Sequence, residues 1–171
     1  YTLPSNRGNW SGADITYDPD RNKVYVLWLE RFDDSSGDSR LLCAEKSLPS
    51  GSWTVHVLED GLGYNSGKKL YKHWVSIVYK DDWIYYTWWW PGYDKIYFGH
   101  KSVVDWNSGG FIRLDSASGG MMSDITLNPA GTMIYMVYVV SPSPGSYEVR
   151  MATATLFPNI STNKETVDDT S

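Results

Sequence analysis

The sequence predicts an all-β protein built from three similar antiparallel units. Apolar and polar residues alternate through much of the chain, which is the period of β-strands rather than helices. One hairpin pattern is written three times. Each copy is followed by further strand-like segments. These three observations together predict a repeated sheet, with no helix expected anywhere in the chain.

The first hairpin occupies residues 14–28. Residues 14–17 form one strand, residues 24–28 form the return strand, and Asp18-Pro-Asp-Arg-Asn22 joins them. Proline fixes its own φ angle, and aspartate and asparagine side chains bond to nearby backbone, so these residue types favour a turn. The segment is therefore interpreted as two paired strands.

The same hairpin recurs at residues 75–88 and 123–138. The only length change falls in the turn, where insertions are tolerated. Matching side chains occupy six aligned columns: Ile15/Ile77/Ile125, Thr16/Val78/Thr126, Tyr17/Tyr79/Leu127, Val24/Ile84/Ile134, Tyr25/Tyr85/Tyr135 and Trp28/Trp88/Tyr138.

Two further strands are predicted after the first two hairpins, and one after the third. Residues 40–47, 95–102 and 147–153 give a third strand, whereas only 53–58 and 111–115 give a fourth. Four strands repeated at this spacing are typical of a propeller blade. We therefore predict a β-propeller-like half-propeller of three four-stranded antiparallel blades, the third of them incomplete. Its parts are an N-terminal arm at 1–12, a three-blade unit at 13–157 (blades at about 13–62, 70–116 and 121–157) and a polar C-terminal tail at 158–171, interpreted as a linker, an arm or a strand donated elsewhere.

The segment from Ser11 to Trp28, with Lys46-Ser47 and Trp53 after it, resembles the repeats of sialidase-type (Asp-box, BNR-like) β-propellers. In that family the third strand ends in a Lys/Ser pair and a Ser-x-Asp-x-Gly-x-x-Trp turn. Residues 47–53 lack the aspartate and are one residue short, and residues 102–111 contain Asp105 at a longer spacing. The resemblance covers about residues 9–155. It implies a propeller, but the arginine triad and Arg-Ile-Pro motif of sialidases are missing, so it does not carry over their activity.

Three blades leave two blade faces open. Closed propellers have 4 to 8 blades, so we consider three ways to cover these faces. The chain pairs with a second copy to give six blades, belongs to a longer propeller, or stacks head to tail into a filament. A β-sandwich is the alternative that needs no such completion.

Composition narrows the possible partners. The net charge is −5 and the isoelectric point is about 5.1, which argues against a nucleic-acid partner. The longest apolar run, residues 83–91, is too short to span a membrane. The chain begins with tyrosine and contains glycosylation sequons at Asn9 and Asn159. We therefore expect a secreted or cell-surface protein.

A ligand site is expected at one rim. In each hairpin the residues before the first strand and after the second lie at the same end. Aromatic rings there can stack on a sugar, and charged groups can bond its hydroxyls. For Trp10 and Trp74 the alternative is wedging between blades. The predicted ligand-binding residues are Trp10, Arg31, His73, Trp74, Trp90 and Tyr93.

An enzymatic interpretation requires paired carboxylates at the same rim. Asp14 and Asp124 share a repeat column, and Glu30 lies on the same rim. These three are the catalytic candidates if the protein is a glycosidase. The alternative is that aspartate at a strand start simply caps a turn.

Other chemistry is confined to one acidic turn. Asp18, Asp20 and Asn22 have the spacing that opens a calcium loop, without its glycine and distal glutamate, and a plain turn is the alternative. Calcium is thus the only cofactor considered. The preferred function is a non-catalytic extracellular module that recognises glycan or protein and completes a propeller by self-association. The alternatives are a sialidase-like glycoside hydrolase fragment, active once the propeller is complete, and a structural subunit of a surface filament.

Overall fold

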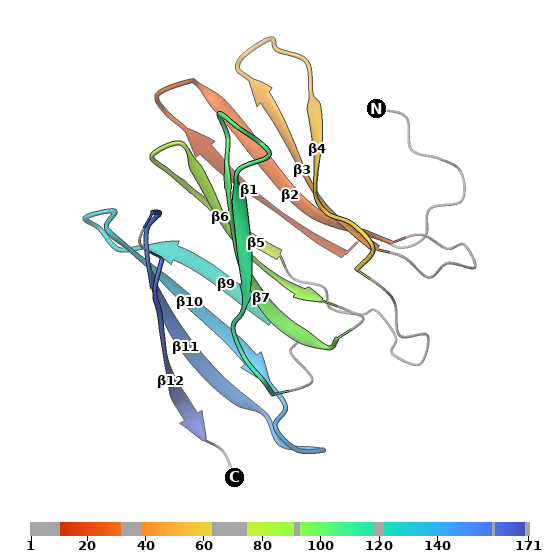
Figure 1. Cartoon of the computed structure of the whole chain (residues 1–171), viewed down its shortest axis with the longest axis vertical. Helices are drawn as coiled ribbons and strands as arrows, with labels where there is room; N and C mark the ends of the chain where they lie inside the picture. The colour runs from red at the N-terminus through yellow and green to blue at the C-terminus, as the bar shows by residue number, and fades with distance from the viewer. Residues whose placement is uncertain are drawn as a thin grey trace.

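The computed structural model describes residues 11–31, 39–62, 75–90, 93–117, 122–158 and 160–169. Three four-stranded antiparallel sheets stand side by side (Figure 1). Blade 1 contains β1 (Ser11–Asp18), β2 (Lys23–Arg31), β3 (Ser39–Ser47) and β4 (Thr54–Glu59). Blade 2 contains β5 (Val75–Lys80), β6 (Trp83–Trp90), β7 (Lys95–Ser102) and β8 (Gly109–Arg113). Blade 3 contains β9 (Met122–Leu127), β10 (Met133–Val140), β11 (Glu148–Thr155) and β12 (Thr162–Asp169).

Strand order within each blade follows chain order, so every blade is a meander. The first strands of the blades are neighbours: β1 lies beside β5, and β5 lies beside β9. The Tyr79 amide donates to Thr16 Oγ1 at 3.0 Å, which ties the first two of these inner strands together. The predicted all-β fold of three repeated blades is confirmed. In the part of the chain that the structure describes, no helix could cross a membrane.

The third blade is complete, which corrects the prediction. Thr162–Asp169 was assigned to a polar tail, but it pairs antiparallel with β11 as the fourth strand. Its side chains from Asn163 to Val167 are exposed, so it has no buried face and no apolar alternation for a sequence pattern to reveal. An outermost strand can be held by backbone hydrogen bonds to a single neighbour.

Each blade has two faces with different neighbours. We call the face toward the following blade the front and the face toward the preceding blade the back. Two apolar cores fill the two boundaries. The front of blade 1 meets the back of blade 2 through buried residues that include Tyr25, Leu27, Leu41, Cys43, Ile77, Tyr86 and Trp88. The front of blade 2 meets the back of blade 3 through buried residues that include Tyr85, Trp89, Phe98, Ile125, Ile134, Met136 and Tyr138.

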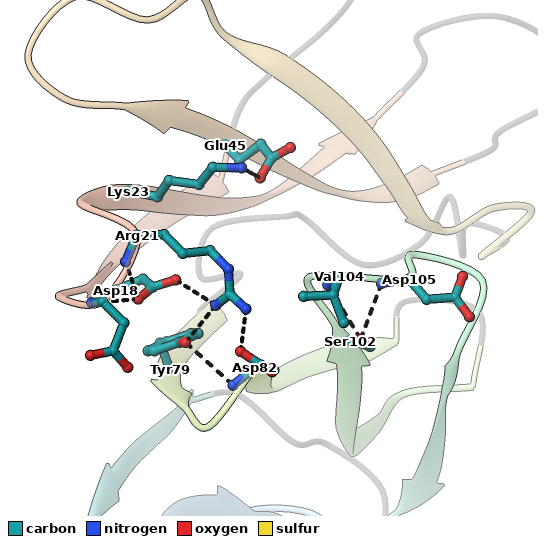
Figure 2. Close-up of polar contacts among 10 residues, drawn as sticks. Asp18, Arg21, Lys23, Glu45, Tyr79, Asp82, Ser102, Val104 and Asp105 are labelled. Carbon is teal, nitrogen blue, oxygen red and sulfur yellow. Dashed lines mark hydrogen bonds and ion pairs between the residues drawn. The ribbon is translucent and has the colours of Figure 1, made fainter.

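A buried aspartate clamps blade 1 to blade 2 (Figure 2). Asp18, at the end of β1, is fully buried. Its Oδ2 accepts a hydrogen bond from Arg21 Nη1 at 3.0 Å. The same guanidinium donates to Tyr79 Oη at 3.0 Å and forms an ion pair with Asp82, both in blade 2. Arg21 thus joins a carboxylate of one blade to two side chains of the next.

A second cluster of the same residue types clamps blade 2 to blade 3. Asp115, just after β8, is buried and accepts from Arg150 Nη1 at 2.7 Å and from Tyr138 Oη at 3.2 Å. Arg150 and Tyr138 belong to β11 and β10. Both blade boundaries therefore contain an Asp–Arg–Tyr cluster built on a buried aspartate.

These clusters shift the pKa values of their carboxyl groups. Burial alone raises the pKa of Asp18, but hydrogen bonds from Arg21 and Asp20 outweigh it, and the net pKa is lowered. For Asp115, burial is likewise outweighed by hydrogen bonds from the Ala117 amide, Arg150 and Tyr138, which lower the pKa. Both groups therefore favour folding when ionised.

Replacing Arg21 with methionine tests the first clamp. The substitution leaves the buried Asp18 carboxylate without its cationic partner, so we expect a loss of about 2–3 kcal/mol in the free energy of unfolding at neutral pH. Urea denaturation measures it. The control is Lys80→Met, which removes a solvent-accessible pair with Asp81 and should cost about 0.5 kcal/mol or less. Equal effects of the two substitutions would contradict the clamp.

Acid should weaken the protein through the same groups. A carboxyl whose pKa is lowered by folding stabilises the protein above its unfolded pKa, and this stability is lost as the pH falls through the folded pKa. We therefore expect the urea midpoint to drop below about pH 4. The penalty of Arg21→Met should shrink over the same range, because protonated Asp18 no longer requires a cation. A penalty that stays constant from neutral pH to about pH 3 would exclude this linkage.

Candidate functional site

Two carboxylates and one hydroxyl meet at the inner strands. Ser76 Oγ lies 2.9 Å from Asp14 Oδ2 and 2.8 Å from Asp124 Oδ1. The three residues come from β1, β5 and β9, one from each blade. Each immediately precedes the isoleucine of its repeat, so they occupy one repeat column. The adjacency of the inner strands is what brings this column together.

Hydrogen bonding makes the two carboxylates unequal. Asp14 is half-buried, and its two oxygens accept from the amides of Ile15 and Ile77, each at 2.8 Å. Asp124 is exposed, and its Oδ1 accepts from the Ile125 amide at 2.8 Å. Among the described residues, nothing donates to Asp124 Oδ2. Because a serine hydroxyl has one proton, it donates to only one carboxylate at a time. The site therefore has spare acceptor capacity that faces solvent.

A pocket of about 430 Å³ opens beside these groups. Apolar side chains form most of its wall, and the two carboxylates and Ser76 form its polar part. This combination can bind the apolar face of a ligand and orient its hydroxyl groups. The lining residues are Ala13, Asp14, Val75, Ser76, Met122, Ser123, Asp124, Val137, Tyr138 and Val139.

The predicted ligand residues Trp90 and Tyr93 lie in blade 2, outside this pocket. Their rings meet at a centroid distance of 5.1 Å in an edge-on arrangement. Trp90 also contacts Tyr97 and Phe111, at 4.9 and 5.7 Å. Tyr93 and Phe111 are exposed, and Trp90 is half-buried. We call these four residues the aromatic patch.

Of the remaining predicted ligand-binding and catalytic residues, the structure describes the side chain of Glu30 alone. Glu30 is buried in β2 and does not line the pocket. Arg31 ends β2, but its side chain lies outside the described residues. Trp10, His73 and Trp74 also lie outside them, as do the sequon asparagines.

Local hydrogen bonds hold the acidic turn that contains Asp18, Asp20 and Asn22. The Asp18 carboxylate accepts from the amides of Asp20 and Arg21 at 2.9 and 3.1 Å, besides the Arg21 guanidinium. Asn22 Oδ1 accepts from Tyr17 Oη at 2.8 Å. These contacts engage side-chain oxygens of Asp18 and Asn22, two of the three residues in the calcium hypothesis. Within the described ranges no group of three or more His, Cys, Asp or Glu residues could hold a metal ion.

Sequence reasoning missed Ser76. The signal was available, because Ser76 stands in the column of Asp14 and Asp124, directly before Ile77. A serine between two aspartates carries no charge and matches no motif. Its role comes from the position of its strand between the other two.

Comparisons with known proteins bear on the fold. No protein-family model matches the chain, and no curated protein matches it in sequence. Solved structures do match. A bifunctional GH43-CE protein of Bacteroides eggerthii is 13% identical with a TM-score of 0.54, over 96% of this chain and 20% of that one. A thermostable family-43 glycoside hydrolase is 13% identical with a TM-score of 0.56, over 93% of this chain and 59% of that one.

A third similar structure is an N-acetylgalactosamine deacetylase from F. plautii in complex with blood group B trisaccharide. It is 11% identical with a TM-score of 0.59, over 98% of this chain and 54% of that one. The chain thus spans less than two thirds of each of these three proteins. The similarity supports a partial propeller of the kind found in family-43 glycoside hydrolases. The sialidase-type subfamily predicted from the sequence is not among these matches and stays a prediction.

Replacing Ser76 with alanine tests the bridge between the inner strands. It removes the hydroxyl that joins Asp14 and Asp124, and we expect unfolding to become easier by about 1 kcal/mol. The control is Ser123→Ala. Among the described residues the buried Ser123 Oγ has no hydrogen-bond partner, so its loss should be neutral or slightly stabilising. Thermal and urea unfolding of both variants decide the matter, and an equal cost would argue against the bridge.

Proposed function

We propose that this chain is a non-catalytic carbohydrate-binding part of a β-propeller, with its site at the pocket between the inner strands. The observation that carries the proposal is the meeting of Asp14, Ser76 and Asp124, one from each blade, at the polar end of this pocket. Carboxylate oxygens accept hydrogen bonds from the adjacent hydroxyls of a sugar. The apolar wall suits the C–H face of the same ring.

The accessibility of Asp124 favours binding. A ligand can reach its Oδ2 without displacing a described protein donor, so little hydrogen bonding is lost on binding. Asp14 is held by two amides and contributes a preorganised acceptor. A single site of this size gives modest affinity, as is usual for shallow sugar sites.

The aromatic patch offers a second contact for an extended glycan. Trp90 holds Tyr93 through ring contacts, and the Tyr93 ring is exposed. Such rings stack on sugars while their polar groups bond hydroxyls. A glycan that is long enough to span the pocket and the aromatic patch would put one sugar in the pocket and another sugar of the same chain on the patch. The proposed setting is secreted or cell-surface, in keeping with a glycan ligand.

Glycoside hydrolysis is the second candidate. Asp14 and Asp124 both reach one hydroxyl, which makes them close enough to act as the carboxyl pair of a glycosidase. Two of the three similar structures are named as family-43 proteins. Against this candidate, Glu30 is buried and does not line the pocket, so the third predicted carboxylate is missing from the site.

Glycan-array screening followed by calorimetric titration tests the proposal. We expect Asp124→Asn to weaken binding about tenfold, because a charge-assisted hydrogen bond becomes a neutral one. Asp81→Asn is the matched control: it makes the same charge change on an exposed turn of blade 2 and should leave affinity unchanged. Tyr93→Ala against Tyr147→Ala, two exposed tyrosines, tests the aromatic patch in the same titration.

The two candidate functions give different outcomes. Binding without turnover of aryl glycosides supports the binding module. Turnover that Asp14→Asn abolishes would replace it with the hydrolase. Equal affinities of Asp124→Asn, Asp81→Asn and the wild type would place the ligand elsewhere.

A further inference from the structure

We propose that the open front of blade 3 docks on the open back of blade 1 of a second copy, so that two copies close a six-bladed ring. This assembly goes beyond the proposed sugar binding and does not depend on it. It follows from comparing equivalent positions in the three blades, which carry the same residues but differ in burial.

The back face of blade 1 has no preceding blade to cover it, as a comparison of the three back faces shows. Ile15, Ile77 and Ile125 occupy one repeat column on the backs of the three blades. Ile77 and Ile125 are 3% and 5% exposed, whereas Ile15 is 60% exposed. The residue type is identical, so the difference comes from the preceding blade, which covers the second and third isoleucines only. Val24 follows the same rule: its equivalents Ile84 and Ile134 are fully buried, and it is not.

The front face of blade 3 likewise has no following blade to cover it, as a comparison of the three front faces shows. Tyr25, Tyr85 and Tyr135 form a column of identical residues on the fronts. The first two are 0% and 1% exposed, while Tyr135 is only half-buried. Val137 is 44% exposed, whereas Leu27 in the equivalent position of blade 1 is fully buried. An apolar face of this kind is costly to leave in water.

The two open faces match because the chain already contains this interface twice. At the first boundary Tyr25, on the front of blade 1, stacks on Tyr79, on the back of blade 2, with ring centroids 5.9 Å apart and planes at 14°. The equivalent pair across the new boundary is Tyr135 and Tyr17 of the partner subunit. In the single chain Tyr17 is 48% exposed. The front of blade 3 therefore repeats a surface that already binds a back face of this repeat.

Two copies of the three described blades give six blades. Closed propellers have 4 to 8 blades, so a ring of two copies falls within this range and a ring of three does not. Each interface joins a front to a back, and a repeated contact of this kind closes into a ring of two when each chain turns the next by 180°, which is the angle that three blades span in a six-bladed ring. Val137 and Val139, which line the pocket, lie on the open front, so the partner subunit would supply the missing wall of the pocket.

Light scattering coupled to size-exclusion chromatography tests the assembly without any sugar. We expect the wild-type chain, of 19.4 kDa, to elute as a dimer. Ile15→Asp damages only the back and Tyr135→Asp only the front, and neither residue lines the pocket. Each variant alone breaks both interfaces of the ring. Each should weaken dimerisation about 100-fold or more, because an unpaired charge would be buried.

Mixing the two variants identifies the pairing. The Ile15→Asp chain keeps an intact front and the Tyr135→Asp chain an intact back, so an equal mixture contains one undamaged interface. It should regain dimers, held by that interface alone, that neither variant forms by itself. Back-to-back or front-to-front dimers would instead be abolished by one variant, untouched by the other and not restored by mixing. Val104→Asp, at an exposed turn position between β7 and β8, is the control and should stay dimeric.

Circular dichroism of all variants separates lost assembly from lost folding. Both substituted positions are accessible to solvent in the single chain, so the β spectrum should be retained. A monomeric wild-type chain, an open polymer, or no recovery on mixing would overturn the closed front-to-back ring. Sugar binding by a monomer would leave the proposed function standing while removing this assembly.

Discussion

The face-to-face packing of one blade on the next is the interaction on which this structure depends. A four-stranded sheet buries an apolar face only if another layer covers it. Here the front of each of the first two blades is covered by the back of the following one, through two continuous cores. Among the described residues, each of these two cores is shared by two blades. The repeated sequence therefore stabilises the contacts between blades. Equivalent positions carry similar side chains because they pack at equivalent blade-to-blade contacts.

Charged clusters give these boundaries a fixed arrangement. Apolar packing alone is nondirectional, and two flat faces could slide. Arg21, paired with the buried Asp18 of its own blade, reaches across the first boundary to Tyr79 and Asp82. At the second boundary the buried Asp115 of blade 2 bonds Arg150 and Tyr138 of blade 3. These contacts are satisfied at one relative position of the blades only. They come from different repeat positions, so the two boundaries share chemistry without sharing columns.

The inner strands turn this packing into a site. Their adjacency aligns equivalent positions from three blades, and at one column the residues are Asp14, Ser76 and Asp124. Two aspartates and their common column could be predicted from the sequence, because repeats at matching strand starts must gather near one axis. Ser76 stands in the same column and could have been found in the same way. The packing of Trp90 on Tyr97 and Phe111 and the burial of Glu30 could not be predicted, since each depends on which neighbouring side chains fill the space.

The sequence by itself determined the blades. Period-two alternation and three aligned hairpins specify local strands and turns, and these depend on short-range geometry that residue types encode directly. Only the tertiary structure decided the features that depend on a neighbouring strand or a neighbouring blade. It recruited the polar segment Thr162–Asp169 as a strand through backbone pairing with β11, which side-chain patterns do not record. It also made identical residues such as Ile15 and Ile77 differ in burial, because exposure is a property of the blade alongside and not of the residue.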